Sequence, residues 1–205
     1  MSEHTARTRR PSGPPSPRSD PAGLPVGGGK GEGRTAGRDR PCQVTVMNRQ
    51  RRLLPLDGDW LRRALTRVAA EEHLGRSAVN VVLVSDRQIR RLNRDFHGRA
   101  EVTDVLTFDY GPDGEEEDVE AEVVVSAERA LAEGFSRGLP PDGELLLYCI
   151  HGLLHLAGYE DATRAGRQRM WRRQLWHLGR AGFQGRRWKD SPRASGNPSR
   201  TESTR

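Results

Sequence analysis

Apolar side chains recur along this chain with two different spacings, and the spacing predicts the secondary structure. Residues 43–47 alternate polar and apolar side chains, which is typical of a strand with one buried face. Residues 78–84 form a nearly continuous apolar and β-branched run, which is typical of a strand buried on both faces. The runs at 105–110 and 121–126 predict two further strands, so the pattern indicates a four-stranded sheet.

Apolar residues spaced three and four apart predict helices between and after the strands. The first helix is expected over residues 59–73 with Gly75 as its stop, and the second over 87–96, capped by Ser85 or Asp86. Alternating strands and helices followed by consecutive helices predict an α+β fold, a single domain in which a mixed four-stranded sheet packs against helices. The three consecutive helices are expected over about residues 127–137, 142–157 and 163–178.

The two ends of the chain differ from its middle in composition. Residues 1–40 and 191–205 are rich in Pro, Gly, Ser and Arg and hold almost no large apolar side chains. Such segments cannot bury enough surface to fold. We therefore predict a disordered extension over 1–40, one folded domain over 41–190 and a disordered tail over 191–205.

The chain is basic, with 34 Lys and Arg against 28 Asp and Glu, but the excess lies outside the predicted domain. Lys and Arg outnumber Asp and Glu by 8 to 4 in residues 1–40 and by 3 to 1 in 191–205, whereas residues 41–190 carry 23 of each. Within the domain, residues 113–122 form an acidic run that we expect to be exposed, and arginines crowd the last predicted helix. Two interpretations of that helix stay open, a solvated face and an RNA-contacting one.

Cys42 and Cys149 are too few for a disulfide framework and lack a Cys-x-x-Cys spacing, which favours a reduced cytosol. The N-terminus has no apolar signal-peptide core, and no apolar stretch approaches the roughly 20 residues that span a bilayer. We therefore expect a cytoplasmic protein without a membrane segment.

The stretch from His151 to Asp161 holds the strongest chemical signal. Residues four apart lie on the same face of a helix, so His151 and His155 can converge on one ion. Gly158 is placed to end that helix, and the chain can then bring back a carboxylate from Glu160 or Asp161. Two imidazoles and one carboxylate with an open fourth position have the composition of a catalytic zinc site. Spacing does not choose between the two carboxylates, and the alternative is that the two His are hydrogen-bonded core residues.

The spacing His-x-x-x-His also occurs in zinc proteases, but those carry a Glu general base directly after the first His. Gly152 stands at that position in this chain. Without the carboxylate, the best-known way of activating water for peptide hydrolysis is missing. Proteolysis is therefore disfavoured.

Three ordered blocks extend this signal. The first block, residues 151–161, is His-Gly-Leu-Leu-His-Leu-Ala-Gly-Tyr-Glu-Asp. The second block has two parts: residues 92–98 are Leu-Asn-Arg-Asp-Phe-His-Gly, and residues 103–108 are Thr-Asp-Val-Leu-Thr-Phe. The third block, residues 122–126, is Glu-Val-Val-Val-Ser. The first resembles His-Gly-x-x-His-Leu-x-Gly-Tyr-Asp-His of the bacterial YbeY-type endoribonucleases. The second resembles their Leu-Asn-x-x-Tyr-Arg-Gly followed by Thr-Asp-Val-Leu-Ser-Phe, and the third is similar to one of their strands. The resemblance covers roughly residues 43–178.

This resemblance implies that the domain over 41–190 is a metal-dependent, single-strand-specific endoribonuclease. It further implies a role in ribosomal RNA maturation, at the 3′ end of 16S rRNA, and in ribosome quality control. The expected partners are single-stranded or ribosomal RNA, the small ribosomal subunit and assembly factors. The resemblance assigns His151, His155 and Asp161 as ligands of one Zn²⁺ per chain, with a metal-bound water at the reaction. Fe, Ni and Mn accept the same donor set.

Two positions depart from the family pattern. Asp161 stands where the family has a His, which replaces a neutral ligand by an anionic one and makes a bound water less acidic. His97 stands where the family has an Arg that serves the substrate phosphate or the reaction, so it is a candidate catalytic residue. The alternative is that His97 is an exposed loop residue with no role. Arg94 and Arg99 flank it as RNA-binding candidates.

Because the family Arg is replaced, a second function stays open. It is that of a non-catalytic ribosome-assembly factor in which a structural metal holds the last helices together. A third is a metal-dependent hydrolase of peptides or small molecules. In each case Thr103 and Asp104 are expected to fix their loop by local hydrogen bonds.

Overall fold

The computed structural model describes residues 41–50, 57–76, 78–111, 120–183 and 188. The predicted extension over 1–40, the predicted tail over 191–205 and most of the acidic run at 113–122 lie outside the described residues. Within the described ranges, every helix is too short or too polar to span a lipid bilayer. The elements follow in the order β1 (Gln43–Asn48), α1 (Gly58–Glu71), β2 (Ala78–Val84), α2 (Asp86–His97), β3 (Val105–Asp109), β4 (Ala121–Ser126), α3 (Ala127–Arg137), α4 (Pro141–Leu156) and α5 (Arg164–Arg180).

The four strands form one mixed sheet in the order β1-β2-β4-β3. β1, β2 and β4 are parallel, and β3 is antiparallel to β4. The central place of β2 explains its apolar run, because Val81 joins the core on one face of the sheet and Val82 the core on the other. The predicted α+β class with a mixed four-stranded sheet is confirmed.

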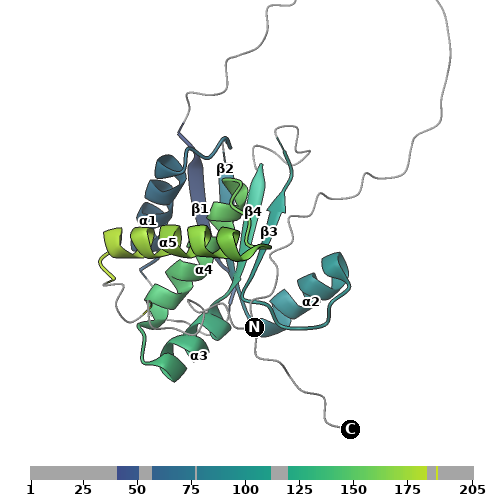
Figure 1. Ribbon diagram of the computed structural model, residues 1–205. Coiled ribbons are helices and arrows are strands. Elements are labelled where there is room, and N and C mark those ends of the chain that lie inside the picture. Colours follow the sequence, from purple (N-terminus) through teal and green to yellow (C-terminus); the bar gives the residue numbers. More distant parts are fainter. Residues whose placement is uncertain (1–40, 51–56, 77, 112–119, 184–187, 189–205) are drawn as a thin grey trace, which may run out of the picture.

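Helices cover the two faces of the sheet unequally (Figure 1). α1 and α4 pack on one face and α2 packs on the other, while α5 lies across α4. α4 is apolar on nearly all sides, and 13 of its 16 residues are buried. A helix of that kind belongs in a protein interior. α4 therefore lies at the centre of the domain, between the sheet and α5.

Local sequence signals set the ends of the helices next to the candidate site. Ser85 caps α2 in a capping box with Gln88, as predicted. Gly158 follows the end of α4 with a left-handed φ of 88°, and the N–H of Tyr159 donates to the carbonyl of Leu154 at 2.9 Å. The chain thus turns sharply after α4, as the glycine predicts.

The predicted stop of α1 at Gly75 is wrong. The helix ends at Glu71, because His73 itself adopts the left-handed conformation, with a φ of 48°. This turn brings Leu74 into the core, where it is buried. Burial of Leu74 therefore sets the turn two residues before the glycine.

α4 approaches the sheet closely at Gly152. A Cβ added there would overlap Val123 Cγ1 and would lie 3.2 Å from Thr107 Oγ1 and 3.3 Å from Val105 Cγ2. The interior is close-packed, so a residue without a side chain is needed at this point of the helix. The contact sets the rotation of α4 about its axis, and with it the direction in which His151 points.

Gly152→Ala is expected to lower the free energy of unfolding by about 1–3 kcal/mol, because the added methyl group overpacks a buried contact. Urea unfolding followed by circular dichroism measures the change. Gly179→Ala in α5 is the matched control, since a Cβ there meets no atom within 4 Å. The free energy of unfolding of this control is expected to stay unchanged or to rise by up to about 1 kcal/mol. Unchanged stability of Gly152→Ala would contradict the packing described here.

Candidate metal centre

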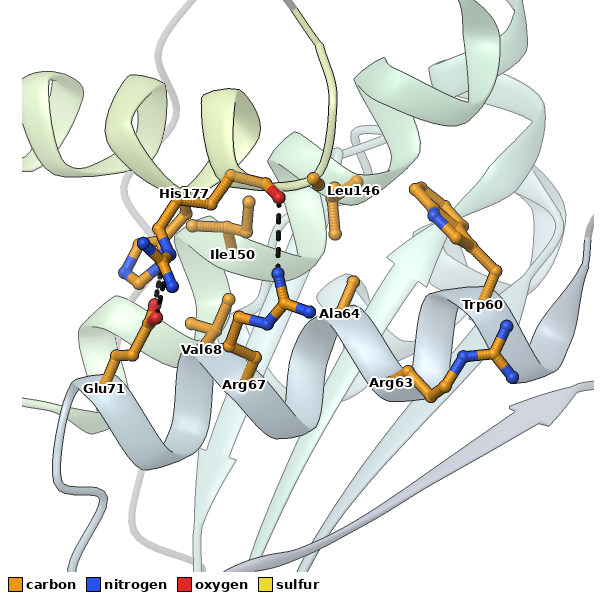
Figure 2. Close-up of a pocket in the computed structure, with 11 residues that line it drawn as sticks. Trp60, Arg63, Ala64, Arg67, Val68, Glu71, Leu146, Ile150 and His177 are labelled. Carbon is orange, nitrogen blue, oxygen red and sulfur yellow. Dashed lines mark hydrogen bonds and ion pairs between the residues drawn. The ribbon is translucent and has the colours of Figure 1, made fainter.

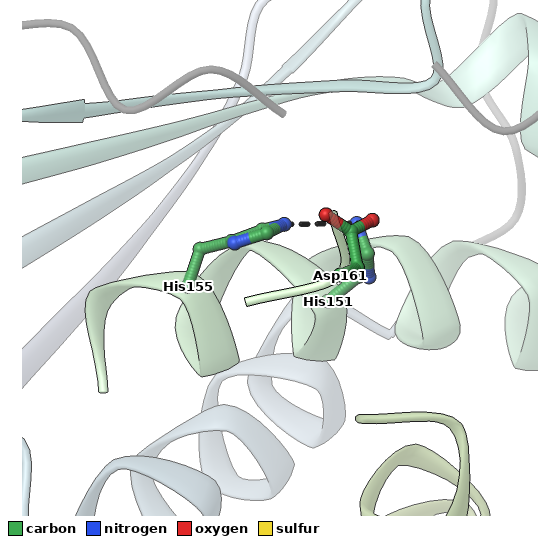
Figure 3. A group of neighbouring side chains, drawn as sticks. All are labelled: His151, His155 and Asp161. Carbon is green, nitrogen blue, oxygen red and sulfur yellow. Dashed lines mark hydrogen bonds and ion pairs between the residues drawn. The ribbon is translucent and has the colours of Figure 1, made fainter. Parts of the chain in front are cut away.

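Three side chains from α4 and the turn after it converge (Figure 3). His151 Nε2 and His155 Nε2 lie 3.2 Å apart, and Asp161 Oδ2 lies 3.9 Å from His151 Nε2. One ligand atom from each residue lies within 4.8 Å of the other two. Two nitrogens bound tetrahedrally to zinc at about 2.1 Å lie about 3.4 Å apart, so the imidazole pair is already at a coordinating separation. The fold thus brings together the three residues that the sequence predicts as ligands.

The hydrogen bond of His155 directs one ring nitrogen towards the site. His155 Nδ1 lies 3.0 Å from the carbonyl oxygen of Tyr159. A carbonyl oxygen only accepts, so Nδ1 carries the proton and the lone pair of the neutral ring is on Nε2. This is the form in which an imidazole binds a metal through Nε2, and the turn after α4 selects it.

A side chain of α5 supports the other imidazole. Gln174 is buried, and its amide nitrogen lies 2.7 Å from His151 Nδ1. A half-turn of the amide exchanges its nitrogen and oxygen, after which a protonated Nδ1 donates to the oxygen and Nε2 keeps its lone pair. Gln174 was not among the predicted site residues, although a signal for it exists. It is a polar residue four positions from both Met170 and Leu178, within the buried stripe of α5.

The turn that carries Asp161 is held by backbone contacts. Arg167 Nη1 donates to the carbonyl oxygens of Asp161 and Ala162, at 3.0 Å each. A Cβ added at Gly166 would overlap the carbonyl oxygen of Glu160, so the backbone of Glu160 lies directly against α5. The Glu160 side chain is exposed, whereas that of Asp161 is only 18% exposed and faces His151. The geometry favours Asp161 over Glu160 as the third ligand.

His97 lies at the C-terminal end of α2, outside the group of three. Burial, and then the positive charge of Arg99, lower the pKa of the His97 ring below its usual value. The lowered pKa favours the neutral form of the ring. A neutral imidazole does not offer a phosphate the charge-assisted hydrogen bond of the family Arg. A catalytic role for His97 stays a prediction.

The two RNA-binding candidates, Arg94 and Arg99, lie at the same end of α2 and are exposed. Arg94 donates to the carboxylate of Asp95 at 2.9 Å, so part of its charge is compensated. Arg99 lies beyond the left-handed glycine that ends α2. Their contact with RNA stays a prediction.

The loop after Arg99 is held by local hydrogen bonds, as expected for Thr103 and Asp104. Thr103 Oγ1 lies 3.3 Å from Asp104 Oδ1 and 3.3 Å from the carbonyl oxygen of Val105. The Val105 side chain in turn lies beside Gly152. The loop therefore enters β3 next to the helical turn that carries the candidate ligands.

Comparison with known proteins identifies the family. A family model described as endoribonuclease YbeY matches residues 46–182. The chain belongs to the endoribonuclease YbeY family. The YbeY resemblance inferred from three sequence blocks is thus confirmed, and the matched range includes every candidate site residue.

Two endoribonuclease YbeY proteins and one solved structure are similar to this chain over more than half of its length. The endoribonuclease YbeY of Chlorobaculum tepidum is 33% identical over 123 residues, which cover 60% of this chain and 88% of the relative. That of Geobacillus kaustophilus is 33% identical over 135 residues, which cover 61% and 86%. A solution structure of a Thermotoga maritima protein is 28% identical, covers 76% of this chain and 99% of its own, and has a TM-score of 0.49.

Asp161→Ala is expected to lower the bound metal content much more than Glu160→Ala, because only the Asp161 carboxylate faces the two imidazoles. Elemental analysis of the purified variants measures the metal content per chain. Equal metal content in the two variants would rule out Asp161 as the third ligand.

Gln174→Leu is expected to weaken metal affinity by about 10–100-fold, the usual cost of losing a residue that orients a metal-binding His. Competition with a chelator of known affinity measures the change. Gln168→Leu is the control, because Gln168 is exposed on the same helix. If both variants hold the metal as tightly as the unchanged chain, Gln174 serves packing alone.

Proposed function

We propose that this chain is a zinc-dependent endoribonuclease that cleaves single-stranded RNA. Its proposed substrate is ribosomal RNA, at the 3′ end of 16S rRNA and in ribosome quality control, with the small ribosomal subunit and assembly factors as partners in the cytoplasm. Membership of the endoribonuclease YbeY family supports RNA hydrolysis as the reaction. One observation carries the metal dependence: two oriented imidazoles, with Nε2 atoms 3.2 Å apart, lie beside the Asp161 carboxylate.

The donor set suits zinc with an open coordination position. Two imidazole nitrogens and one carboxylate oxygen are three protein ligands, as in catalytic zinc sites. When bound, the ion supplies Lewis acidity to a phosphoryl oxygen. His151 and His155 serve as neutral ligands, and Asp161 lowers the net charge of the centre by one.

Cys149 of α4 and Ser126 of the third sequence block are unsuited to act as nucleophiles. Burial strongly raises the pKa of the Cys149 thiol, which is fully buried in α4. Ser126 caps α3, and its hydroxyl donates to Asp86 at 2.5 Å. These side chains serve the fold, so water is the favoured nucleophile.

A non-catalytic assembly factor with a structural metal is the alternative function. It is favoured by the position of the three ligands, which join α4 to the turn before α5, so that an ion there ties the last two helices together. His97, whose lowered pKa favours the neutral ring, stands in the position of the family Arg and also favours this function.

Metal removal separates the two functions. Protein stripped of metal by a chelator is expected to stay folded and to stop cleaving single-stranded RNA, because the core formed by the sheet and α4 is extensive without the ion. Circular dichroism and an RNA-cleavage assay are measured on the same sample. Unfolding upon metal removal would support the structural role instead.

A matched pair of histidine variants completes this test. His155→Ala is expected to reduce cleavage by at least about 100-fold, because it removes a ligand rather than a residue that orients one. His73→Asn is the control, since His73 is exposed and Asn tolerates its left-handed backbone. Full cleavage by His155→Ala would contradict the proposed function.

A further inference from the structure

A cavity of about 270 Å³ lies between α1, α4 and α5 (Figure 2). None of the three candidate metal ligands lines it. Its volume is just below the roughly 300 Å³ at which ligand pockets usually begin, so it suits a small group. Apolar side chains form much of its wall, with Trp60 at one end: Ala64 and Val68 from α1, and Leu146 and Ile150 from α4.

The rim of this cavity is basic. Arg63 and Arg67 stand four residues apart on α1, and Arg180 of α5 also lines the cavity. Arg180 pairs with Glu71 at 2.9 Å, whereas Arg67 donates at 3.3 Å to the carbonyl oxygen of Arg180, which carries no net charge. Arg63 Nη2 lies 3.9 Å from Asp57 Oδ2, and both side chains are more than 60% exposed, where an ion pair is weak. Two guanidinium charges are therefore available to an anion at the cavity.

The cavity adjoins the turn of α4 that carries the candidate metal ligands. Ile150 directly precedes His151, so their Cα atoms are about 3.8 Å apart while their side chains point about 100° apart around the helix. On α5 the two sites follow one another along the helix, because Gln174 contacts His151 whereas His177, three residues later, lines the cavity. The cavity and the metal centre are thus separate sites on neighbouring faces of the α4–α5 pair.

We propose that this cavity holds one nucleotide of the RNA substrate outside the cleavage site. The base lies against Trp60 and the apolar wall, and the flanking phosphates contact Arg63 and Arg67. The proposal rests on the proposed function, because that function supplies RNA as the ligand. Proteins that bind single strands without reading their sequence combine aromatic or apolar platforms for bases with cations for phosphates, and both are present here. A strand held at this second point is aligned beside the metal centre.

A pair of charge reversals tests the phosphate contact. Arg62 and Arg63 are consecutive exposed residues of α1, each within 4 Å of an aspartate, but only Arg63 lines the cavity. Arg63→Glu is expected to weaken the binding of a short labelled oligouridylate by at least about tenfold. The salt dependence of the binding constant is expected to fall by the amount that about one phosphate contact contributes. Arg62→Glu changes net charge equally and is expected to weaken binding by less than about threefold. Equal weakening in the two variants would overturn the proposal.

A pair of uncharged variants tests the space for the base. Ala64→Leu fills the cavity without changing charge, and Ala70→Leu places the same side chain on an exposed position of α1. Binding by Ala64→Leu is expected to fall by at least about tenfold, since a base loses its stacking surface. If Ala64→Leu binds as tightly as Ala70→Leu, no base occupies the cavity.

Both measurements use the full-length metal-bound protein and an oligouridylate with phosphorothioate linkages, which slow its cleavage, and a gel after each reading shows that the RNA is intact. Cleavage by the unchanged chain is measured separately. Absence of cleavage would overturn the proposed function, and the two variant pairs would still decide whether RNA binds in the cavity. Cleavage by the unchanged chain together with equal binding within each pair would overturn the cavity proposal alone. Circular dichroism verifies that each variant is folded.

Discussion

The contact between α4 and the sheet at Gly152 is the constraint on which the candidate metal centre depends. Val123 and Thr107 leave no room for a side chain there, so the helix backbone lies directly on β3 and β4. A buried helix in such a contact has little freedom to rotate, because protein interiors are close-packed. The rotation of α4 decides that His151 and His155 face the turn that brings back Asp161. Gly152 occupies the position at which zinc proteases carry their Glu general base, and in this chain it is needed for packing.

Hydrogen bonds from two other segments then select the ring nitrogens that face the centre. The Tyr159 carbonyl requires a proton on Nδ1 of His155, and Gln174 reaches Nδ1 of His151 from α5. Rings held in one orientation lose little further freedom when an ion binds, which lowers the entropic cost of binding. This arrangement distinguishes the pair from two histidines that only fill a core, because their Nε2 atoms meet at 3.2 Å.

The arginines of α5 do not form one uniform basic surface. Arg173 and His177 hydrogen-bond to Glu72, the residue that directly follows α1, and Arg180 pairs with Glu71. Burial lowers the pKa of His177 below its usual value, while the carboxylates of Glu72 and Glu71, one beside each ring nitrogen, oppose this shift. Part of the positive charge of α5 therefore serves its contact with α1. This contact closes the cavity at the end away from Trp60. The solvated and the RNA-contacting interpretations of this helix both omitted that structural role.

The sequence by itself determined the strands, the helices and the α4 face that carries His151 and His155, because periodicity and caps act over a few residues. Only the tertiary structure decided what depends on distant segments. Gln174 meets His151 across 23 residues of chain, and the cavity needs side chains from three helices. Spacing alone left Glu160 and Asp161 equivalent, and family resemblance favoured Asp161. The structural distinction comes from the contact of the Glu160 backbone with α5, a close approach that no local pattern encodes.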